Sequence, residues 1–471
     1  MVHAYSLNGF NILLDVNSGM VHVVDDLALQ LVQKINREIE EGSLSETAPQ
    51  IQTDSFAEKI LADIAFQDAD PDEVRETISE IAELIAEDAL YTADLYRAAL
   101  PKVHARNSVI KAMCLHVAHD CNLACKYCFA EGGEYHSHDR SLMSFETGKK
   151  ALDFLVEHSG ARRNLEVDFF GGEPLMNFEV VKQLVAYGRS LEQEKGKNFR
   201  FTLTTNAVLL DDEITEFLNR EMANVVLSID GRKEVNDRMR VTRNGKGSYD
   251  LIVPKIQAFV KQRGDKDHYI RGTFTRYNLD FASDIEEFLN LGFENLSIEP
   301  VVTTAEYGIR KEDLPQIMDE YDRLAKLYID RRKEGRPFTF FHFMIDLDEG
   351  PCVIKRLSGC GSGTEYIAVT PNGDIYPCHQ FAGQTDFKIG NVDEGITNTE
   401  IPDRFRSASV YTKDKCEKCF AKFYCSGGCP ANSWNFSRDI NKVYEIGCEM
   451  QRKRTECAIM IKAAMAESEE S

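Results

Sequence analysis

The thirteen cysteines constrain this chain of 471 residues more than any other feature. They gather at short spacings in a few segments, whereas the cysteines of a disulfide framework spread along a chain, and their number is odd. No basic patch followed by an apolar stretch opens the sequence, so nothing indicates export to an oxidising compartment. Metal ligation is therefore the expected use of these thiols.

The charge of the chain limits its partners. It has 55 Lys and Arg against 77 Asp and Glu, for a formal charge of −22. An acidic surface disfavours phosphate backbones, so we expect no nucleic-acid partner. No run of about 18 apolar residues occurs, and we expect a cytoplasmic protein without a membrane-spanning segment. The length predicts about three domains.

Residues 108–345 alternate between short apolar stretches and longer amphipathic ones. Helices such as 144–159 and 177–194 are expected between six strands, at 113–118, 165–170, 200–204, 225–229, 269–274 and 295–300. This alternation predicts an α/β fold with a parallel sheet and right-handed crossovers. Six such units favour a partial (β/α)6 barrel, similar to a TIM barrel, over a flat sheet.

Residues 1–95 are expected to form a separate module, followed by a linker at 96–107. The turn Asn17-Ser18-Gly19 predicts a β-hairpin, and helices are expected at 26–40, 54–66 and 71–98, a pattern that suggests a winged-helix-like unit. Residues 1–100 hold five Lys and Arg against twenty Asp and Glu, a charge of −15. This excess indicates a docking face for a basic partner, with a solvated helical surface as the alternative.

The third expected domain, residues 346–471, holds nine of the thirteen cysteines and ends in a helix. A hairpin turn is expected at Pro371-Asn372-Gly373-Asp374, and little other regular structure is expected before that helix. Bound metal is expected to stabilise this region where an apolar core cannot.

Cys121, Cys125 and Cys128 directly follow the first expected strand, with the spacing C-x3-C-x2-C. Three thiolates in one loop can hold three irons of a four-iron cluster and leave the fourth iron open to a substrate or cofactor. A zinc loop that lacks one ligand and a group of three buried thiols are the alternatives.

The segment Gly171-Gly172-Glu173-Pro174 follows the second expected strand. Paired glycines allow the backbone to approach a ligand closely, and the glutamate can pair with an ammonium group. Together with the three cysteines, this segment resembles the radical S-adenosylmethionine (SAM) superfamily, whose open iron binds the amino and carboxylate groups of SAM. The resemblance covers 108–345 and implies SAM contacts from Tyr127, Gly171, Gly172, Glu173, Asn206, Ser228 and Arg240. The last three could instead be ordinary turn or capping residues.

The C-terminal cysteines carry a second resemblance, to the SPASM extension, which holds two auxiliary four-iron clusters in related maturases. It rests on Cys360, Gly373 and Cys378, then Cys416-x2-Cys419-x5-Cys425-x3-Cys429, and Cys448. By that pattern Cys416, Cys419, Cys425 and Cys448 would hold one cluster, and Cys360, Cys378 and Cys429 the other, for three [4Fe-4S] clusters in all.

The second auxiliary set is one cysteine short. Cys352 is a candidate fourth ligand; without it, the open iron could bind a substrate thiolate. Cys114 and Cys457 are expected to be small buried side chains. A zinc ribbon is the alternative for the whole region.

Residues 7–19 and 359–366 are similar to the maturases of SCIFF peptides, which are short, Cys-rich, ribosomally made precursors. This resemblance implies that SAM is cleaved to a 5′-deoxyadenosyl radical, that the radical takes hydrogen from a core residue, often threonine, and that a cysteine thiolate closes a thioether. It also implies a Lys-rich leader that adds to the hairpin edge, and a reductant protein such as flavodoxin or ferredoxin.

Two other functions stay open from the sequence. The chain could oxidise a cysteine or serine to formylglycine, as sulfatase maturases do. It could also be a non-catalytic iron–sulfur electron-transfer protein.

Overall fold

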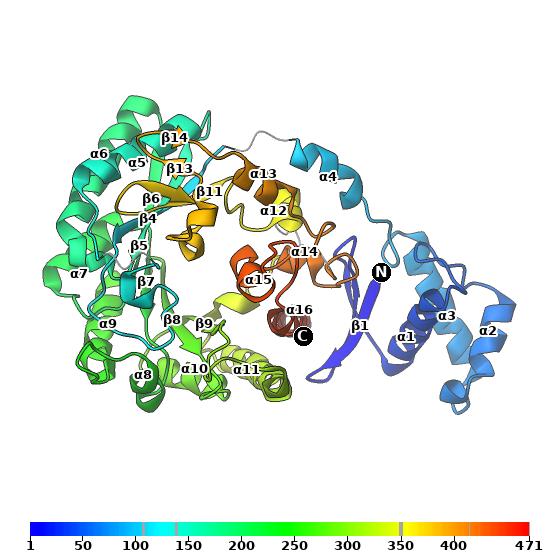
Figure 1. The fold of residues 1–471 in the computed structure, drawn as a ribbon. Helices are drawn as coiled ribbons and strands as arrows, with labels where there is room; N and C mark the ends of the chain where they lie inside the picture. Colours follow the sequence, from blue (N-terminus) through cyan, green and yellow to red (C-terminus); the bar gives the residue numbers. More distant parts are fainter. Residues whose placement is uncertain (106–108, 137–139, 348–351, 414, 471) are drawn as a thin grey trace.

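The computed structural model covers residues 1–471 and describes all of them except 106–108, 137–139, 348–351, 414 and 471. Its strands form a three-stranded sheet near the N-terminus and an eleven-stranded sheet in the order β10-β9-β8-β7-β6-β5-β4-β11-β12-β13-β14, in which β10 (Thr339–Phe340) is an outer strand. Figure 1 shows the N-terminal helices at one end of the molecule and the large sheet with its helices at the other. None of the helices in the described residues is both long and apolar enough to span a membrane.

The N-terminal module is an antiparallel sheet followed by helices. The predicted hairpin is confirmed, and a third strand extends it: β1 (Val2–Leu7), β2 (Phe10–Asp15) and β3 (Val21–Val24). The helical elements are α1 (Asp26–Glu40), α2 (Asp54–Leu61), η1 (Ile64–Phe66) and α3 (Pro71–Ala86). Asp25 and Thr53 cap the first two helices. The winged-helix likeness of this unit stays a prediction.

Two of the expected helices were drawn too long. The helix expected at 54–66 is divided, because Asp63 caps η1 by accepting from the Ala65 amide. The helix expected at 71–98 ends at Ala86, and α4 (Tyr96–His104) follows. Asp88 and Tyr91 between them have left-handed φ angles of 55°, and the buried Tyr91 hydroxyl donates to Asn36 Oδ1 at 3.0 Å. The helix therefore ends before Tyr91, and the side chain of Tyr91 is buried in the core of the module.

The three-stranded sheet packs on both of its faces. Leu13 belongs to a core shared with α1 and α3, whereas Ile12 and Leu14 point into the main core of the molecule. The Tyr5 hydroxyl donates to the Glu456 carbonyl at 3.0 Å, and His3 stacks on Phe420. The module is thus attached to the C-terminal helix α16 (Glu445–Glu470) through its sheet.

All six strands predicted for the central region are confirmed, with bounds that lie within two residues of those expected. They are β4 (Ala112–Ala118), β5 (Asn164–Gly171), β6 (Asn198–Thr205), β7 (Asn224–Ser228), β8 (His268–Phe274) and β9 (Asn295–Pro300), and they pair in chain order and in parallel. The intervening helices include α5 (Phe145–His158), α6 (Phe178–Lys195), α7 (Asp212–Glu221), α8 (Lys233–Met239), α9 (Tyr249–Arg263), α10 (Phe281–Asn290) and α11 (Leu314–Lys333). The sheet is mixed, because the C-terminal strands β12, β13 and β14 pair antiparallel. The partial barrel stays a prediction.

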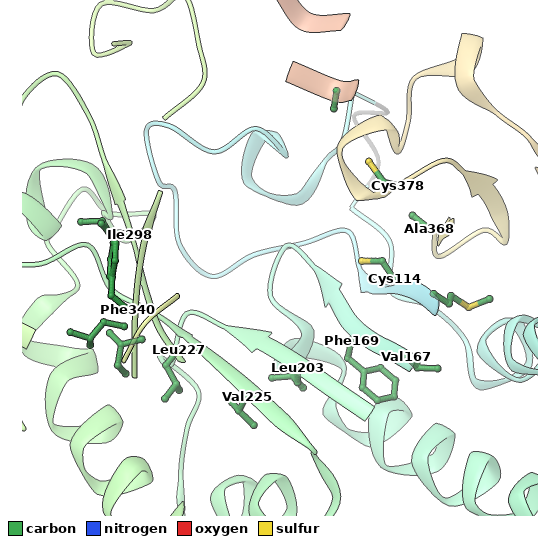
Figure 2. Packing of buried hydrophobic residues seen from close by; sticks show 14 of the residues in the cluster. Cys114, Val167, Phe169, Leu203, Val225, Leu227, Ile298, Phe340, Ala368 and Cys378 are labelled. Carbon is green, nitrogen blue, oxygen red and sulfur yellow. The ribbon is translucent and has the colours of Figure 1, made fainter. Parts of the chain in front are cut away.

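Alternate side chains of these strands lie on opposite faces of the sheet. Apolar side chains with no exposed surface lie on the face covered by the helices, among them Val167, Phe169, Leu203, Val225 and Leu227 (Figure 2). The residues between them in the sequence are more polar and less buried, so the two faces differ in character. The polar face is where a ligand would find hydrogen-bonding partners.

The C-terminal region contains the predicted hairpin, in which β11 (Tyr366–Val369) and β12 (Asp374–Tyr376) turn at Gly373 with φ 85°. The short strands β13 (Gly390–Asn391) and β14 (Gly395–Ile396) follow. β11 also pairs with β4, so this region continues the central sheet.

The expectation of little other regular structure in this region was wrong. Helices α12 (Val353–Ser358), α13 (Glu400–Ser407), α14 (Lys422–Cys425) and α15 (Pro430–Ser437) precede α16. α16 packs along α11 and buries Met450, Ile459 and Met460. Apolar burial therefore contributes to this region's stability.

Substitutions in the N-terminal module test whether its stability depends on its apolar core. Ile35 has no exposed surface, so Ile35→Ala should cost about 2–5 kcal/mol of the module's stability. Ile64 is 79% exposed, and Ile64→Ala should cost less than about 0.5 kcal/mol. Amide hydrogen exchange by mass spectrometry would measure both. Equal protection of residues 1–95 in the two variants would contradict the packing described here.

Candidate active site

The loop that carries Cys121, Cys125 and Cys128 begins at the carboxyl end of β4 and is held by its backbone. The Ala124 amide donates to the Val241 carbonyl at 2.7 Å, and the Lys126 amide donates to the Met239 carbonyl at 2.9 Å. Sequence reasoning missed Arg243, which donates from Nε to the Cys121 carbonyl at 2.7 Å and pairs with Asp120. Nothing in its local sequence distinguishes it from a surface arginine.

The three thiols of this loop lie close enough together to interact electrostatically. Burial raises the pKa of the Cys121 thiol to about 12 and that of Cys125 to about 11. Thiolates here therefore need a neighbouring positive charge, which bound iron supplies. This donor set fits a cluster held through three irons.

Gly171 and Gly172 allow a close approach, but to the cysteine loop itself. A Cβ atom on Gly171 would lie 2.1 Å from the Ala118 carbonyl oxygen, and one on Gly172 would lie 2.2 Å from that of Asp120. The Gly172 amide donates to the Ala118 carbonyl at 2.8 Å, and the Glu173 amide donates to that of Asp120 at 2.9 Å. The two motifs recognised in the sequence are thus one packed unit.

Glu173 is buried, with 1% of its surface exposed. Its carboxylate accepts from the Leu175 amide at 3.0 Å, from the Thr205 hydroxyl at 2.8 Å and from the Asn206 amide at 2.8 Å. Burial raises its pKa to about 7, and these hydrogen bonds oppose that shift. Glu173 therefore ties the end of β5 to the end of β6 beside the cysteine loop.

Tyr127, Asp230 and Arg240 form a buried network that closes over this loop. The Tyr127 hydroxyl donates to Asp230 at 2.7 Å, and Arg240 Nη1 donates to the Tyr127 oxygen at 2.9 Å. Arg240 lies 3.8 Å from the Asp230 carboxylate. Burial raises the pKa of Asp230 to about 6, although Arg240 lowers it. The sequence pointed to Tyr127 and Arg240 as SAM contacts but gave Asp230 no role.

The other two expected SAM contacts lie at strand ends. Asn206 follows β6, and its Nδ2 donates to Asn122 Oδ1 at 2.7 Å and lies 3.6 Å from Cys121 Sγ. Ser228 ends β7, two residues before Asp230, and is half-buried. Among the described residues, the buried donors Asn122 Nδ2 and Arg240 Nε have no hydrogen-bond partner. Unpaired donors near the cysteine loop fit a ligand that carries carboxylate and hydroxyl acceptors, as SAM does.

The polar face of the sheet presents ionisable side chains that the sequence did not single out. Burial raises the pKa of Asp168 on β5 to about 6, and this residue accepts from the Thr202 hydroxyl at 2.8 Å. Glu299 on β9 lies 3.3 Å from His342 and 3.7 Å from Arg454 of α16. A carboxylate with a pKa near 6 can accept a proton during a reaction near neutral pH. In the sequence, only the alternation of apolar and polar residues along the strands could have indicated Asp168 and Glu299.

The C-terminal cysteines fall into the two groups expected from the sequence. Cys448 interacts electrostatically with Cys416, Cys419 and Cys425, and these four line a cavity of about 200 Å³. That volume is several times the roughly 30 Å³ of a water molecule, so it suits a cluster better than a single ion. In the described part of the chain, no three His, Cys, Asp or Glu residues are arranged to hold one metal ion.

Cys360, Cys378 and Cys429 form the second group, in which each thiol interacts electrostatically with the other two. Cys352 is exposed and lines a cavity of about 310 Å³ together with Cys360. Cys114 lies on β4 next to Ala368 of β11, close to Cys378 (Figure 2). Cys457 is buried in α16.

His379 connects this second group with the first cysteine loop, and sequence reasoning missed it. It directly follows Cys378, and its ring lies 5.8 Å from that of Phe129, which directly follows Cys128. The ring of Phe170 is 5.1 Å away, and the Tyr366 hydroxyl is 3.2 Å from Nδ1. Aromatic side chains therefore fill the space between the two groups of cysteines.

Two family models match these regions. One, described as a 4Fe-4S single cluster domain, matches residues 111–254. The other, the SPASM domain, described as an iron-sulfur cluster-binding domain, matches residues 360–420. Together they include seven of the ten candidate cluster ligands, since Cys425, Cys429 and Cys448 follow the second match.

Curated relatives extend over most of the chain. An uncharacterized protein of Methanocaldococcus jannaschii is 34% identical over 314 residues, which is 66% of this chain and 99% of the relative. A cysteine-type anaerobic sulfatase-maturating enzyme of Clostridium novyi is 24% identical over 70% of this chain and 90% of its own. The radical SAM cyclopropyl synthase TigE of Paramaledivibacter caminithermalis is 25% identical over 68% of each chain.

Two solved structures share the fold. The structure titled native anSMEcpe with bound AdoMet has a TM-score of 0.63 and 20% identity, and covers 75% of this chain and 99% of its own. Streptococcus suis SuiB bound to the precursor peptide SuiA has a TM-score of 0.52 and 18% identity, and covers 93% of this chain and 96% of its own.

The chain is a homologue of radical SAM proteins and has a SPASM domain. Within that class it is a homologue of the anaerobic sulfatase-maturating enzymes and of TigE. The family uses 4Fe-4S clusters together with SAM, in agreement with the cysteine groups and the unpaired donors described above.

The contact between Gly172 and the cysteine loop gives a test of the site. Gly172→Ala would place a methyl group 2.2 Å from the Asp120 carbonyl oxygen, so the loop must move and the first cluster should be lost. Gly196→Ala is the control, because its Cβ meets nothing within 4 Å and its left-handed φ costs only about 1 kcal/mol. Iron analysis with electron paramagnetic resonance (EPR) of the reduced proteins would measure cluster content. A full set of clusters in Gly172→Ala would contradict this packing.

Proposed function

We propose that this protein is a radical SAM maturase that installs thioether cross-links, from cysteine sulfur to a carbon often of threonine, in a Cys-rich precursor peptide. The observation that carries the proposal is the acidic N-terminal module joined to a radical SAM and SPASM chain. A peptide maturase needs a surface that retains its substrate's leader while the core is modified, and the module offers one. The finer assignment to the SCIFF maturases rests on residues 7–19 and 359–366.

The module's charge supports a basic leader. Three of the four Lys and Arg residues in 1–95 pair with the module's own carboxylates: Lys34 lies 2.8 Å from Asp63, Lys59 pairs with Glu38, and Arg75 lies 3.3 Å from Asp72. The remaining carboxylates give the module a strong negative field that attracts a Lys-rich segment. β3 is an outer strand of its sheet, and Val23 on it is 46% exposed, so a leader can add there as a further strand.

The extent of the structural likeness favours a peptide maturase over a sulfatase maturase. The fold of anSMEcpe covers 75% of this chain. The fold of SuiB, which was solved with its precursor peptide, covers 93% of this chain, so the match must include part of the N-terminal module. Formylglycine formation is the second candidate, because sulfatase-maturating enzymes are among the homologues.

Cluster ligation follows the cysteine groups. Cys121, Cys125 and Cys128 would hold the first cluster, and the two C-terminal groups would hold one auxiliary cluster each. When bound, the first cluster and SAM supply a radical that takes hydrogen from the substrate. Tyr127, Asn206, Ser228 and Arg240 would hold SAM, and the loop backbone clamped by Gly172 and Arg243 would fix the cluster beside it.

The polar face of the sheet would receive the core peptide. Asp168, whose pKa burial raises to about 6, can accept the proton that a substrate thiol releases when its sulfur bonds to carbon. Cys352 would either complete the second auxiliary set or leave it open to a substrate thiolate. A cytoplasmic location and a small reductant protein such as flavodoxin or ferredoxin belong to the same proposal.

Leader binding can be tested at β3. Val23→Lys adds a positive charge at the exposed strand and should weaken binding of a labelled Lys-rich leader peptide about tenfold, or about 1.4 kcal/mol. Ile64→Lys is the matched control, since it makes the same charge change at a more exposed residue of the same module. Fluorescence anisotropy at low salt would measure both affinities. Equal affinities in the two variants would exclude β3 as the docking edge.

The assignment of the cysteine groups predicts two different losses of activity. Cys121→Ala should abolish SAM cleavage, whereas Cys378→Ala should leave cleavage and lose cross-linking. Cys457→Ala, a buried thiol outside the groups, should keep both. Each protein is incubated anaerobically with SAM, reductant and precursor peptide. Chromatography then quantifies 5′-deoxyadenosine, and mass spectrometry after reduction and alkylation counts the lost hydrogens and thiols. Full cross-linking by Cys378→Ala would contradict a role for this group.

A further inference from the structure

Lys413 is a buried lysine that the site described above does not use. Only 6% of its surface is exposed, and its Nζ donates to the Gly427 carbonyl oxygen at 2.7 Å. Among the described residues, no carboxylate lies within ion-pairing distance of it. A buried ammonium with one neutral acceptor is costly unless other negative charge compensates it.

The position of Lys413 indicates where that charge comes from. Gly427 lies between Cys425 of the first auxiliary group and Cys429 of the second, and a Cβ on it would lie 3.2 Å from the Lys413 side chain. Lys413 also lines the cavity that contains Cys360. Burial lowers the pKa of the Lys413 ammonium, and negative charge on Cys416 and Cys425 of the first group and on Cys429 and Cys360 of the second opposes that shift.

We infer that the Lys413 ammonium is a counter-charge shared by the two auxiliary clusters, which makes each of them easier to reduce. Both clusters are anionic when held by thiolates, and each becomes more negative by one charge when it accepts an electron. A fixed positive charge in a low-dielectric site between them stabilises the reduced form of both. This inference rests on the cluster ligation in the proposed function.

The counter-charge has a functional consequence. A reaction that forms a bond to a carbon-centred radical leaves one electron over, and the auxiliary clusters are the acceptors the chain offers. Because Lys413 lies beside both groups of cysteines, its positive charge stabilises an added electron on either cluster. Lys413 therefore acts through the clusters as a residue that sets their potentials, and it need not touch the peptide.

Lys413→Gln separates the charge from the hydrogen bond, because the amide can still donate to Gly427. The variant should lower the equilibrium constant for reduction of both auxiliary clusters about tenfold, which for one electron is about 59 mV. The cluster on Cys121, Cys125 and Cys128 should be unchanged and serves as the internal control. Lys388→Gln is the matched substitution, at an exposed lysine of the same domain that is paired with Asp374.

The measurement is an EPR-monitored redox titration of the anaerobically reconstituted proteins. Unchanged auxiliary potentials in Lys413→Gln would overturn the inference, and a shift in only one cluster would overturn the shared position. If Lys413→Gln does not take up iron, the charge-conserving variant Lys413→Arg is titrated in its place. If Lys413→Arg binds its clusters and their potentials match those of the unsubstituted protein, the result supports a role for the positive charge. If Lys413→Arg does not bind its clusters, the shape of the lysine and not its charge is required, and the inference fails. Iron content of the unsubstituted protein that accounts for only one cluster would instead refute the proposed ligation.

Discussion

The candidate active site depends on the close contact between the cysteine loop after β4 and the glycine pair after β5. Neither Gly171 nor Gly172 has room for a Cβ atom against that loop. Arg243 and the backbone of residues 239–243 hold the loop from its other side. These backbone contacts position the three thiols and also Tyr127, which lies between Cys125 and Cys128 in the loop.

The three parts of the chain contact one another, and the cysteine loop makes one of these contacts. Phe129 at its end approaches His379, which follows Cys378 in the SPASM region. β11 of that region joins β4 directly, and α16 joins the SPASM region to the N-terminal sheet through Tyr5 and His3. A peptide leader on the module and a peptide core on the polar face would therefore be held by parts of one continuous packed body.

Much of this could be predicted from the sequence, because the strongest signals are local. Short apolar stretches between amphipathic ones located all six central strands, and the resemblance of the cysteine pattern to the SPASM extension implied both C-terminal groups. The helix expected at 71–98 was too long because the burial of Tyr91, a tertiary contact, ends it. The short helices α12 to α15 were missed because they lie among glycines and cysteines, and their apolar residues find partners in distant elements, as α12 does against α4 and α14.

The residues missed within the site share one property, which is that their role depends on a distant partner. Arg243 matters because Cys121 lies against it, and Asp230 because Tyr127 and Arg240 meet there. Asp168 and Glu299 are single carboxylates in apolar strands until the sheet brings them to one face. Gly171 and Gly172 were recognised, and the close approach that the structure shows at both is to protein backbone.

Isotope transfer from the peptide to SAM's adenosyl group tests the central claim most directly. A precursor peptide with deuterated threonines would be incubated anaerobically with the reconstituted protein, SAM and reductant, and the 5′-deoxyadenosine analysed by mass spectrometry. The account predicts deuterium in 5′-deoxyadenosine together with peptide that has lost two hydrogens and one alkylatable thiol per event. Undeuterated 5′-deoxyadenosine with an unchanged peptide would contradict it.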